Sequence, residues 1–361
     1  MKNVHGMFGA LIGVFATMLV SEAVAGPKLG LTESSWIQPS VLGQLQARYE
    51  KDAADDVDFY VRRFRIVLAG QVKDGIKFFA ETDCPNTGKS GTTSSSIYAQ
   101  DVFADFRLLK EGDSEAWVAA GLIMLPFSFE SKSSAASVLG NDYNAETIKM
   151  VNDLVWRDIG FEFHGNLGKA LSARVGVFDG YDRYSTATLE KNPEAPVRVT
   201  GHVAFNLLGD AETGSFYTQE RLSKGNYLSL GAGMDMQNRA TRTIATEESP
   251  EPTVADSKAW VLDVQSGFEY EAMTFTVNGA YFDWDNAVFS GSTMFVEAGV
   301  KYGKTMGTAK WSAADPDGGS STTDYTLGVH YFFEQHNAKV GVEYRFGDSA
   351  DVALGSVQFL L

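Results

Sequence analysis

The chain has 361 residues, a formal net charge of -16 at pH 7 and one cysteine, Cys84. A single cysteine excludes a disulfide framework and a cysteine-bound cluster, and the negative charge argues against nucleic-acid binding, which needs basic surfaces. The mean hydropathy is slightly negative. That is too polar for a bundle of membrane-spanning helices, but it suits a β-barrel, in which only every second strand residue meets lipid.

The N-terminal residues have the pattern of a cleavable secretory signal. Lys2 supplies a positive end, residues 7–20 form an apolar centre, and Ala23-Val24-Ala25 gives a small-x-small cleavage pattern. A membrane anchor is the weaker alternative, because a spanning helix needs roughly 18 to 20 apolar residues. We therefore expect residues 1–25 to be a signal peptide. No Pro- or Ser-rich linker divides residues 26–361, so we expect them to form one domain.

The remaining chain consists of segments in which apolar and polar residues alternate. About fifteen of them, each roughly ten residues long, run from Trp36 to Leu361. Alternation at period two marks strands with one apolar and one polar face. This predicts an antiparallel transmembrane β-barrel with lipid outside and water inside, in a bacterial outer membrane. Single-chain barrels of this kind have an even number of strands. We therefore expect about sixteen, with the weakly alternating Thr305–Ala313 as the missing one.

The segment Phe59–Val72 shows the alternation most clearly. Arg63 and Arg65 fall on its polar face and should point into the lumen. The other face should meet lipid, and its Arg62 lies near one end, where a long side chain can reach the interface. The positions assigned to the lipid face are Tyr60, Arg62, Phe64, Ile66 and Leu68.

Turns and loops fall into two classes by length. Lys73-Asp74-Gly75 predicts a tight hairpin with Gly75 in the left-handed region, and this register places Arg65 opposite Asp83. We assign the short turns to the periplasmic side and the long polar loops to the extracellular side. Residues 208–226 are long, yet the strand count places them on the periplasmic side.

The longest connection is Leu125–Trp156, the third extracellular loop of this scheme. Loops of this length are usually functional or disordered, and a barrel this wide holds an open channel unless something narrows it. The run at the start of the loop is too apolar for a freely solvated segment. We predict that the loop folds inward and forms a constriction, with a subunit contact or an external flap as the alternative. The constriction residues are Pro126, Phe127, Phe129 and Glu130.

Charged side chains on the lumenal face are the candidates for ion selection, because rings of one charge near a constriction discriminate by sign. Inward-facing arginines are more numerous than an acidic chain would lead one to expect. They suggest a positive inner wall that lowers the barrier for anions. The candidates are Arg63, Arg65, Lys77, Arg107, Arg157, Arg174 and Arg198, opposed by Asp83, Asp105 and Glu162.

At several of these residues the chain resembles the phosphate-selective porin O/P family. The resemblance implies a sixteen-stranded barrel, usually trimeric, with the third loop inside. Members that select phosphate use a ladder of arginines and a cluster of lysines, whereas the candidate loop here holds only Lys132 and Lys149. The similar stretches are Arg62-Arg63-Phe64-Arg65 with Gly70, Phe78–Asp83, Gly121–Phe127, Arg157–Phe161, Gly176–Gly180 and Tyr325–Arg345.

These patterns predict a passive diffusion porin for small hydrophilic solutes or ions, slightly favouring anions, with no cofactor and no catalysis. Outer-membrane lipid, the solutes and further copies in a homotrimer are its expected partners. Enzymatic activity is the first alternative, but no catalytic motif is recognisable and the five histidines lack metal-ligand spacing. Two further alternatives are a barrel that sheathes a periplasmic electron carrier and an adhesin with acidic outer loops.

Overall fold

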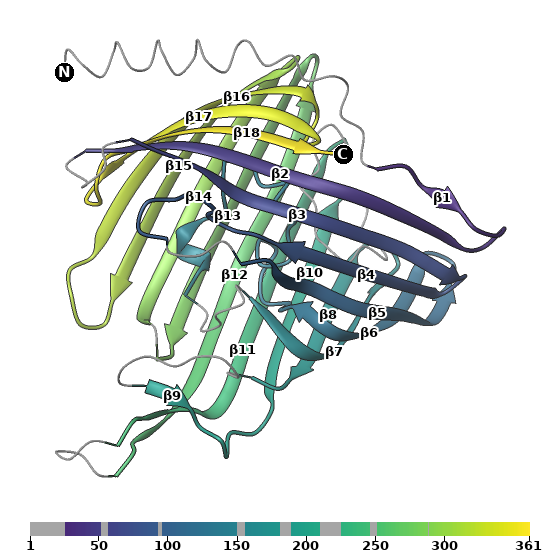
Figure 1. Ribbon diagram of the computed structural model, residues 1–361, viewed down its shortest axis with the longest axis horizontal. Coiled ribbons are helices and arrows are strands. Elements are labelled where there is room, and N and C mark those ends of the chain that lie inside the picture. The colour runs from purple at the N-terminus through teal and green to yellow at the C-terminus, as the bar shows by residue number, and fades with distance from the viewer. Residues whose placement is uncertain are drawn as a thin grey trace.

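The protein is a closed, all-β barrel in a computed structural model (Figure 1). The structure describes residues 26–51, 57–92, 96–149, 156–180, 189–209, 225–245, 251–287 and 289–361. The predicted signal peptide, residues 1–25, lies outside the described residues. So do most of the acidic stretches 52–58 and 247–251 and most of the long connection 208–226.

Sixteen antiparallel strands make up the barrel wall within the described part of the chain. In chain order they are β2 (Trp36–Glu50), β3 (Val57–Lys73), β4 (Ile76–Asp83), β5 (Tyr98–Glu111), β6 (Ser114–Met124), β7 (Arg157–Leu167), β8 (Leu171–Phe178), β10 (Arg198–Leu208), β11 (Tyr227–Thr243), β12 (Val254–Tyr270), β13 (Met273–Asp285), β14 (Ser290–Tyr302), β15 (Thr305–Pro316), β16 (Thr322–Glu334), β17 (Ala338–Gly347) and β18 (Val352–Leu360).

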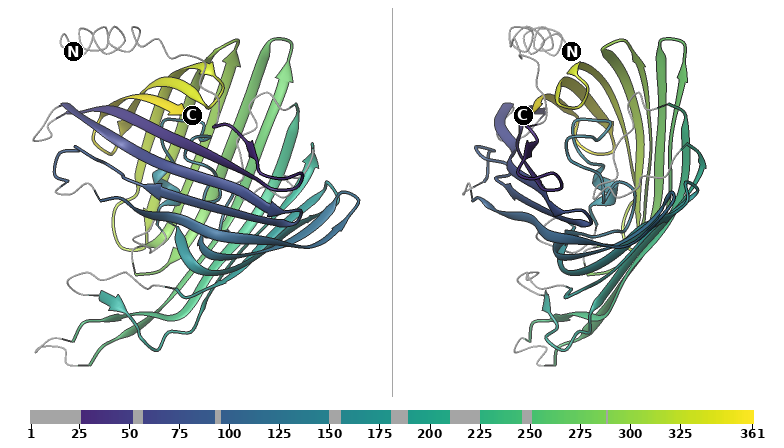
Figure 2. Two further views of the ribbon diagram at one scale, coloured as in Figure 1. Left: turned by 45° about the vertical axis from the view of Figure 1, so that its right-hand side comes forward. Right: turned by 90° about the vertical axis from the view of Figure 1, so that its right-hand side faces the viewer.

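The sheet closes because its first and last long strands pair, with Gln44 of β2 opposite Gln358 of β18. Two short strands lie outside this ring. Strand β1 (Leu29–Gly30) pairs with β2, and β9 (Leu189–Lys191) pairs with the end of β11. The right-hand view of Figure 2 shows the strands curving around the connection that follows β6. The predicted count of sixteen is confirmed, and β15 contains the weak segment Thr305–Ala313.

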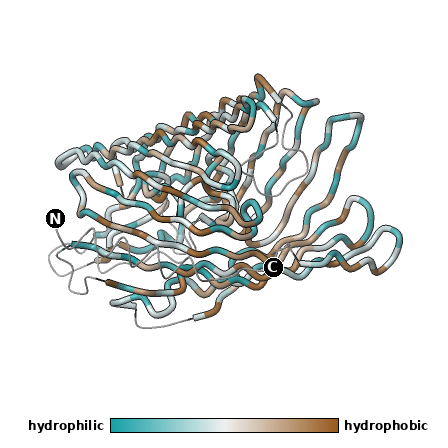
Figure 3. Tube along the Cα trace, turned by 90° about the horizontal axis from the view of Figure 1, so that it is seen from above, coloured by the Kyte–Doolittle hydropathy of each residue, from teal (hydrophilic) through white to brown (hydrophobic). Residues whose placement is uncertain are grey.

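Burial follows the alternation along the strands. In β7, Phe161 and Phe163 are 58% and 51% exposed on the outer face, whereas Glu162 and His164 between and after them are 0% and 5% exposed. Apolar and polar residues alternate along the wall in Figure 3. This inverts the pattern of a water-soluble domain, so the outer face is built to meet lipid. Among the described residues, no helix is long and apolar enough to cross a membrane.

The first hairpin confirms the predicted register. Gly75 has φ +78° at the turn, and Val67 pairs with Glu81. An irregularity next to the turn places Lys73 opposite Ile76, and the ladder from Gln71 onward has the expected partners. Arg65 therefore lies across from Asp83, and the two side chains form an ion pair of 3.0 Å.

The assignment of Tyr60 and Arg62 to the lipid face is wrong. Between β2 and β3 the register shifts, so that Gln44 pairs with Arg63 while the next residue, Leu45, pairs with Val61. Arg62 is the extra residue of a β-bulge, which changes the direction of the side chains on one side of it. Tyr60 is 8% exposed and its hydroxyl donates to Gln46 at 2.8 Å. Alternation in the sequence does not reveal such an insertion.

Candidate functional site

The connection after β6 is buried over most of its described length. Here we call its described part, Leu125–Lys149, the plug segment; it contains the short 3-10 helix η1 (Ala145–Thr147). Most of its residues up to Asn144 are buried, including Pro126 and Phe127. Loop backbone buried to this degree needs partners for its polar groups and its apolar side chains. The contacts of the plug segment therefore show which strands of the barrel wall hold it in place.

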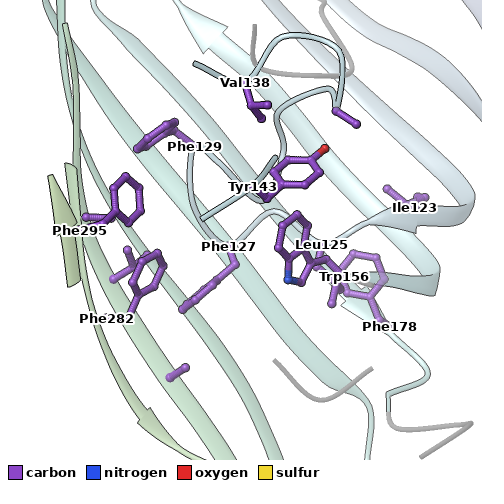
Figure 4. Close-up of a cluster of buried hydrophobic side chains, with 14 of the residues drawn as sticks. Ile123, Leu125, Phe127, Phe129, Val138, Tyr143, Trp156, Phe178, Phe282 and Phe295 are labelled. Carbon is purple, nitrogen blue, oxygen red and sulfur yellow. The ribbon is translucent and has the colours of Figure 1, made fainter. Parts of the chain in front are cut away.

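Aromatic side chains attach the start of the plug segment to the wall far from its own strand. The Phe127 ring centroid lies 5.4 Å from that of Trp284 on β13, and the Phe129 centroid lies 6.4 Å from that of Phe295 on β14. Figure 4 shows Phe127 and Phe129 of the plug segment beside Phe282 and Phe295 of the wall. Aromatic pairs at such spacings stabilise contacts beyond their buried area.

A buried ion pair holds the plug segment to β7. The Lys132 ammonium lies 2.8 Å from the Glu162 carboxylate, and the two side chains are 1% and 0% exposed. The Glu162 carboxylate also forms an ion pair with the Arg174 guanidinium of β8, at 2.9 Å. The Lys132 ammonium donates a hydrogen bond to the Met124 carbonyl as well. Burial lowers the pKa of Lys132 to about 8, although Glu162 opposes the shift. A buried charge of this kind is tolerated only because its partner and hydrogen bonds are in place.

The tip of the plug segment reaches the other side of the barrel. Leu139 packs against Met306 of β15 and Phe332 of β16. The Lys339 ammonium of β17 donates to the carbonyls of Val138 and Gly140 at 3.1 and 3.2 Å.

Two glutamines bind the plug segment at the seam where the barrel closes. Gln44 of β2 donates to the Ala135 carbonyl at 3.0 Å, and Gln358 of β18 donates to the Ala136 carbonyl at 2.8 Å. The two glutamines also bond to each other at 2.7 Å. Backbone carbonyls of the plug segment thus receive donors from both ends of the sheet.

Glu130 organises the plug segment internally. Its carboxyl accepts from the backbone N–H of Asn144 at 2.9 Å and from the Asn144 amide at 2.8 Å, and it also bonds to the Thr147 hydroxyl. Burial, followed by the neighbouring Glu297 carboxylate, raises the pKa of Glu130 to about 8. This predicted constriction residue therefore ties the two halves of the plug segment together.

Each of the candidate wall arginines has a carboxylate partner. Arg65 pairs with Glu81 at 2.7 Å as well as with Asp83, and Arg157 pairs with Asp101 at 3.1 Å. These residues belong to four strands, β3, β4, β5 and β7, on the side of the barrel where the plug segment starts. Further pairs are Arg198 with Asp235 at 2.6 Å, Arg63 with Asp142 at 2.7 Å and Arg174 with Glu162.

The three remaining candidates cluster around Trp117 of β6. The Lys77 ammonium lies 4.2 Å from the centroid of the indole ring, and the Arg107 guanidinium carbon lies 5.5 Å from it. Arg107 also pairs with Asp74 at the first turn, and Asp105 lies 3.1 Å from His164. These cations are therefore engaged by an aromatic face and by carboxylates near that end of the barrel.

Sequence reasoning missed the residues that line the open cleft of the lumen. We define this cleft by the plug residues 139–145 on one side and by strands β14–β18 on the other. A single register row crosses its wall, running from Glu297 through Lys310 and Thr326 to Arg345. Glu343 and Thr308 line it as well. Their inward parity was readable, but the strand that carries Lys310 was the one with the weakest alternation.

A closed sixteen-stranded barrel with an apolar outer face and a charged inner face defines a transmembrane β-barrel. The chain belongs to the phosphate-selective porin O and P family, which its sequence matches over residues 42–354. It is accordingly an outer-membrane porin that passes solutes by passive diffusion, a member of a channel family rather than of a catalytic one.

The fold is similar to several solved structures of low sequence identity. OmpF of Salmonella typhi, in complex with daunomycin, has a TM-score of 0.64 and 12% identity, covering 93% of this chain and 100% of that one. A mutant of Rh. blastica porin has a TM-score of 0.58 and 16% identity, covering 90% and 100%. A loop-deletion mutant of OmpT from Vibrio cholerae has 0.59 and 13%, covering 91% and 100%. No curated protein matches the sequence.

Proposed function

We propose that this porin is a homotrimeric general diffusion channel for small hydrophilic solutes. In this proposal residues 1–25 are removed on export, and the plug segment sets the width of the water-filled path. The observation that carries the proposal is the span of the plug contacts. They begin beside β6, include β7, β13 and β14, and end on β15–β18 and β2. A segment with contacts at such distant points of the ring narrows the bore.

The charge pattern favours weak rather than strict ion selection. Strict anion selection requires cations that remain available to the solute. The arginines of β3, β7, β8 and β10 are held in ion pairs with carboxylates and are largely buried. The nearby carboxylates therefore cancel most of the attraction that these arginines would exert on an anion in the lumen. We therefore propose that the wall arginines hold the plug side of the barrel together and contribute little to a preference for phosphate.

The alternative function, a sheath around a periplasmic electron carrier, needs a bore wide enough for a protein. The plug segment would have to leave the lumen to provide it. Doing so would break the buried Lys132–Glu162 pair and uncover the Phe127 and Phe129 rings. Separating a buried ion pair is unfavourable when one charge remains buried with fewer partners. This contact set favours the diffusion channel.

The test is single-channel recording in planar bilayers with the wild type and a variant in which residues 127–148 are replaced by a short Gly/Ser linker. We expect the deletion to raise the conductance several-fold, because it removes the material that narrows the bore. A matched control shortens the polar connection 317–321 and should leave the conductance unchanged. Equal conductance of the wild type and the plug deletion would contradict the constriction. A wild type that forms no channel would contradict the function itself.

A further inference from the structure

The cleft opposite the ion-paired arginines carries charges of both signs. Its cations are Lys310 and Arg345, and its carboxylates are Glu297 and Glu343. A third carboxylate at its edge, Asp142, is already engaged by Arg62 at 2.6 Å and Arg63 at 2.7 Å. The formal charges of the remaining four groups cancel. A solute in this cleft meets neither a positive wall nor a negative one.

The two cations are held more loosely than the arginines on the plug side. The Lys310 ammonium lies 3.6 Å from Glu146, and its side chain is 21% exposed. Arg345 forms no ion pair with a carboxylate in the part of the chain that the structure describes. Its Nη2 donates to the Ala350 carbonyl at 3.4 Å, and its Nε is buried without a hydrogen-bond partner. These groups keep hydrogen-bonding capacity for an anionic group of a solute.

The two carboxylates are oriented by amide donors. Glu343 accepts from the backbone N–H of Asn141 at 2.9 Å. Glu297 accepts from the side-chain amides of Asn278 and Asn144 at 3.0 and 3.2 Å. These amide donors carry no formal charge of their own. The carboxylates remain attractive to a cationic group of a solute.

The arrangement in the barrel wall brings the two signs close together. Glu297 and Lys310 are direct partners across β14 and β15, and Arg345 lies two strands further in the same row. Directly opposed residues on neighbouring strands have Cβ atoms about 5 Å apart. A small solute can therefore contact charges of both signs at once. A solute with only negative charge is attracted by the cations and repelled by the carboxylates.

We propose that this cleft passes small dipolar solutes, which carry one cationic and one anionic group, in preference to solutes with negative charge alone. The inference rests on the proposed diffusion function and names its solute class. Glu297 and Glu343 contact the cationic group of the solute, and Lys310 and Arg345 contact the anionic group.

The experiment compares two probes of nearly the same size, taurine and isethionate, which differ in having an ammonium or a hydroxyl beside the sulfonate. Their efflux from proteoliposomes is measured with arabinose efflux as the reference for an open channel. We expect taurine to leave the wild-type vesicles faster than isethionate. The difference should be roughly threefold per charge, the effect of a unit charge at about 6 Å in water.

Substitutions separate the contributions of the two signs. Glu297→Gln with Glu343→Gln keeps hydrogen-bond acceptors in place and should reverse the order, slowing taurine and speeding isethionate. Lys310→Gln with Arg345→Gln should slow both. The matched control, Lys258→Gln with Arg239→Gln, removes the same charge from exposed cations outside the cleft and should change neither rate. Glu297→Gln alone serves if the double carboxylate variant does not fold, because it leaves the Glu343–Asn141 bond intact.

Two results would overturn the inference. One is isethionate efflux from the wild type that equals or exceeds taurine efflux. The other is a carboxylate variant that leaves the ratio of the two rates unchanged. In both cases arabinose still leaves the vesicles, so the diffusion function stands. If arabinose does not leave wild-type vesicles, the proposed function fails instead.

Discussion

The two sides of the barrel wall use the same residue types differently. On β3–β11, Arg65, Arg157 and Arg198 have side chains at most 5% exposed and carboxylate partners within 3.1 Å. On β15–β17, Lys310 lies 3.6 Å from its carboxylate partner, and Arg345 has none among the described residues. The number of inward cations therefore does not predict the charge that a solute meets. The position of the plug segment decides which charges stay available.

The largest effect that sharpens this comparison is expected at Lys132. Lys132→Ala leaves the buried Glu162 with Arg174 as its remaining ion-pair partner. Removing one partner of a buried ion pair destabilises by up to about 3 to 5 kcal/mol, and Arg174 reduces this loss. The free energy of unfolding, measured in denaturant with detergent-solubilised protein, reports it. The control Lys258→Ala removes the exposed partner of Asp256 and should cause no measurable change. If both variants lost the same free energy of unfolding, the buried Lys132–Glu162 pair would contribute no more to stability than the exposed Lys258–Asp256 pair.

The next effect is a pH dependence carried by Glu130. Its folded pKa, raised to about 8, lies above the unfolded value. Ionisation is therefore disfavoured in the folded state, and stability falls as the pH rises through the window from about 4.5 to 8. Glu130→Gln should flatten the curve of unfolding free energy against pH in this window. Lys132 acts in a separate window above pH 8. Its pKa is lowered in the folded state, so the unfolded chain binds more protons there and the free energy of unfolding rises with pH. An unchanged slope in Glu130→Gln would contradict the assignment.

The smallest effect on stability is expected at Arg345. Because it has no carboxylate partner among the described residues, Arg345→Gln should change the free energy of unfolding by only about 0.5 kcal/mol. The same denaturation assay measures it, with Lys132→Ala as the reference for a large change. A loss at Arg345 that matched the loss at Lys132 would show that both sides of the wall are held with equal strength, and the comparison would fail.

Much of the barrel could be predicted from local pattern. Alternation located the strands, and the even strand count recovered Thr305–Ala313 although its own pattern is weak. The parity of the first hairpin placed Arg65 opposite Asp83. The apolar run around Phe127 and Phe129 marked a segment that does not stay in water. Each of these inferences uses residues close in sequence or a rule for closed barrels.

The remaining features depend on contacts that sequence spacing does not encode. The bulge at Arg62 interrupts the ladder without interrupting the alternation of residue types. Asp101 and Asp235, the carboxylates that neutralise Arg157 and Arg198, lie more than 30 residues away from them in sequence. Lys310 and Arg345 line a cleft because the plug residues 139–145 lie across from their strands. The path of the plug segment is therefore the part of the site that required a structure.

The glutamine pair at the seam has a mechanical consequence. Gln44 and Gln358 belong to the first and last long strands, and both hold carbonyls of neighbouring plug residues. The plug segment thus connects β2 and β18, the two strands whose pairing closes the barrel. Without the plug segment, β2 and β18 are joined by their backbone ladder and by the hydrogen bond between the Gln44 and Gln358 side chains.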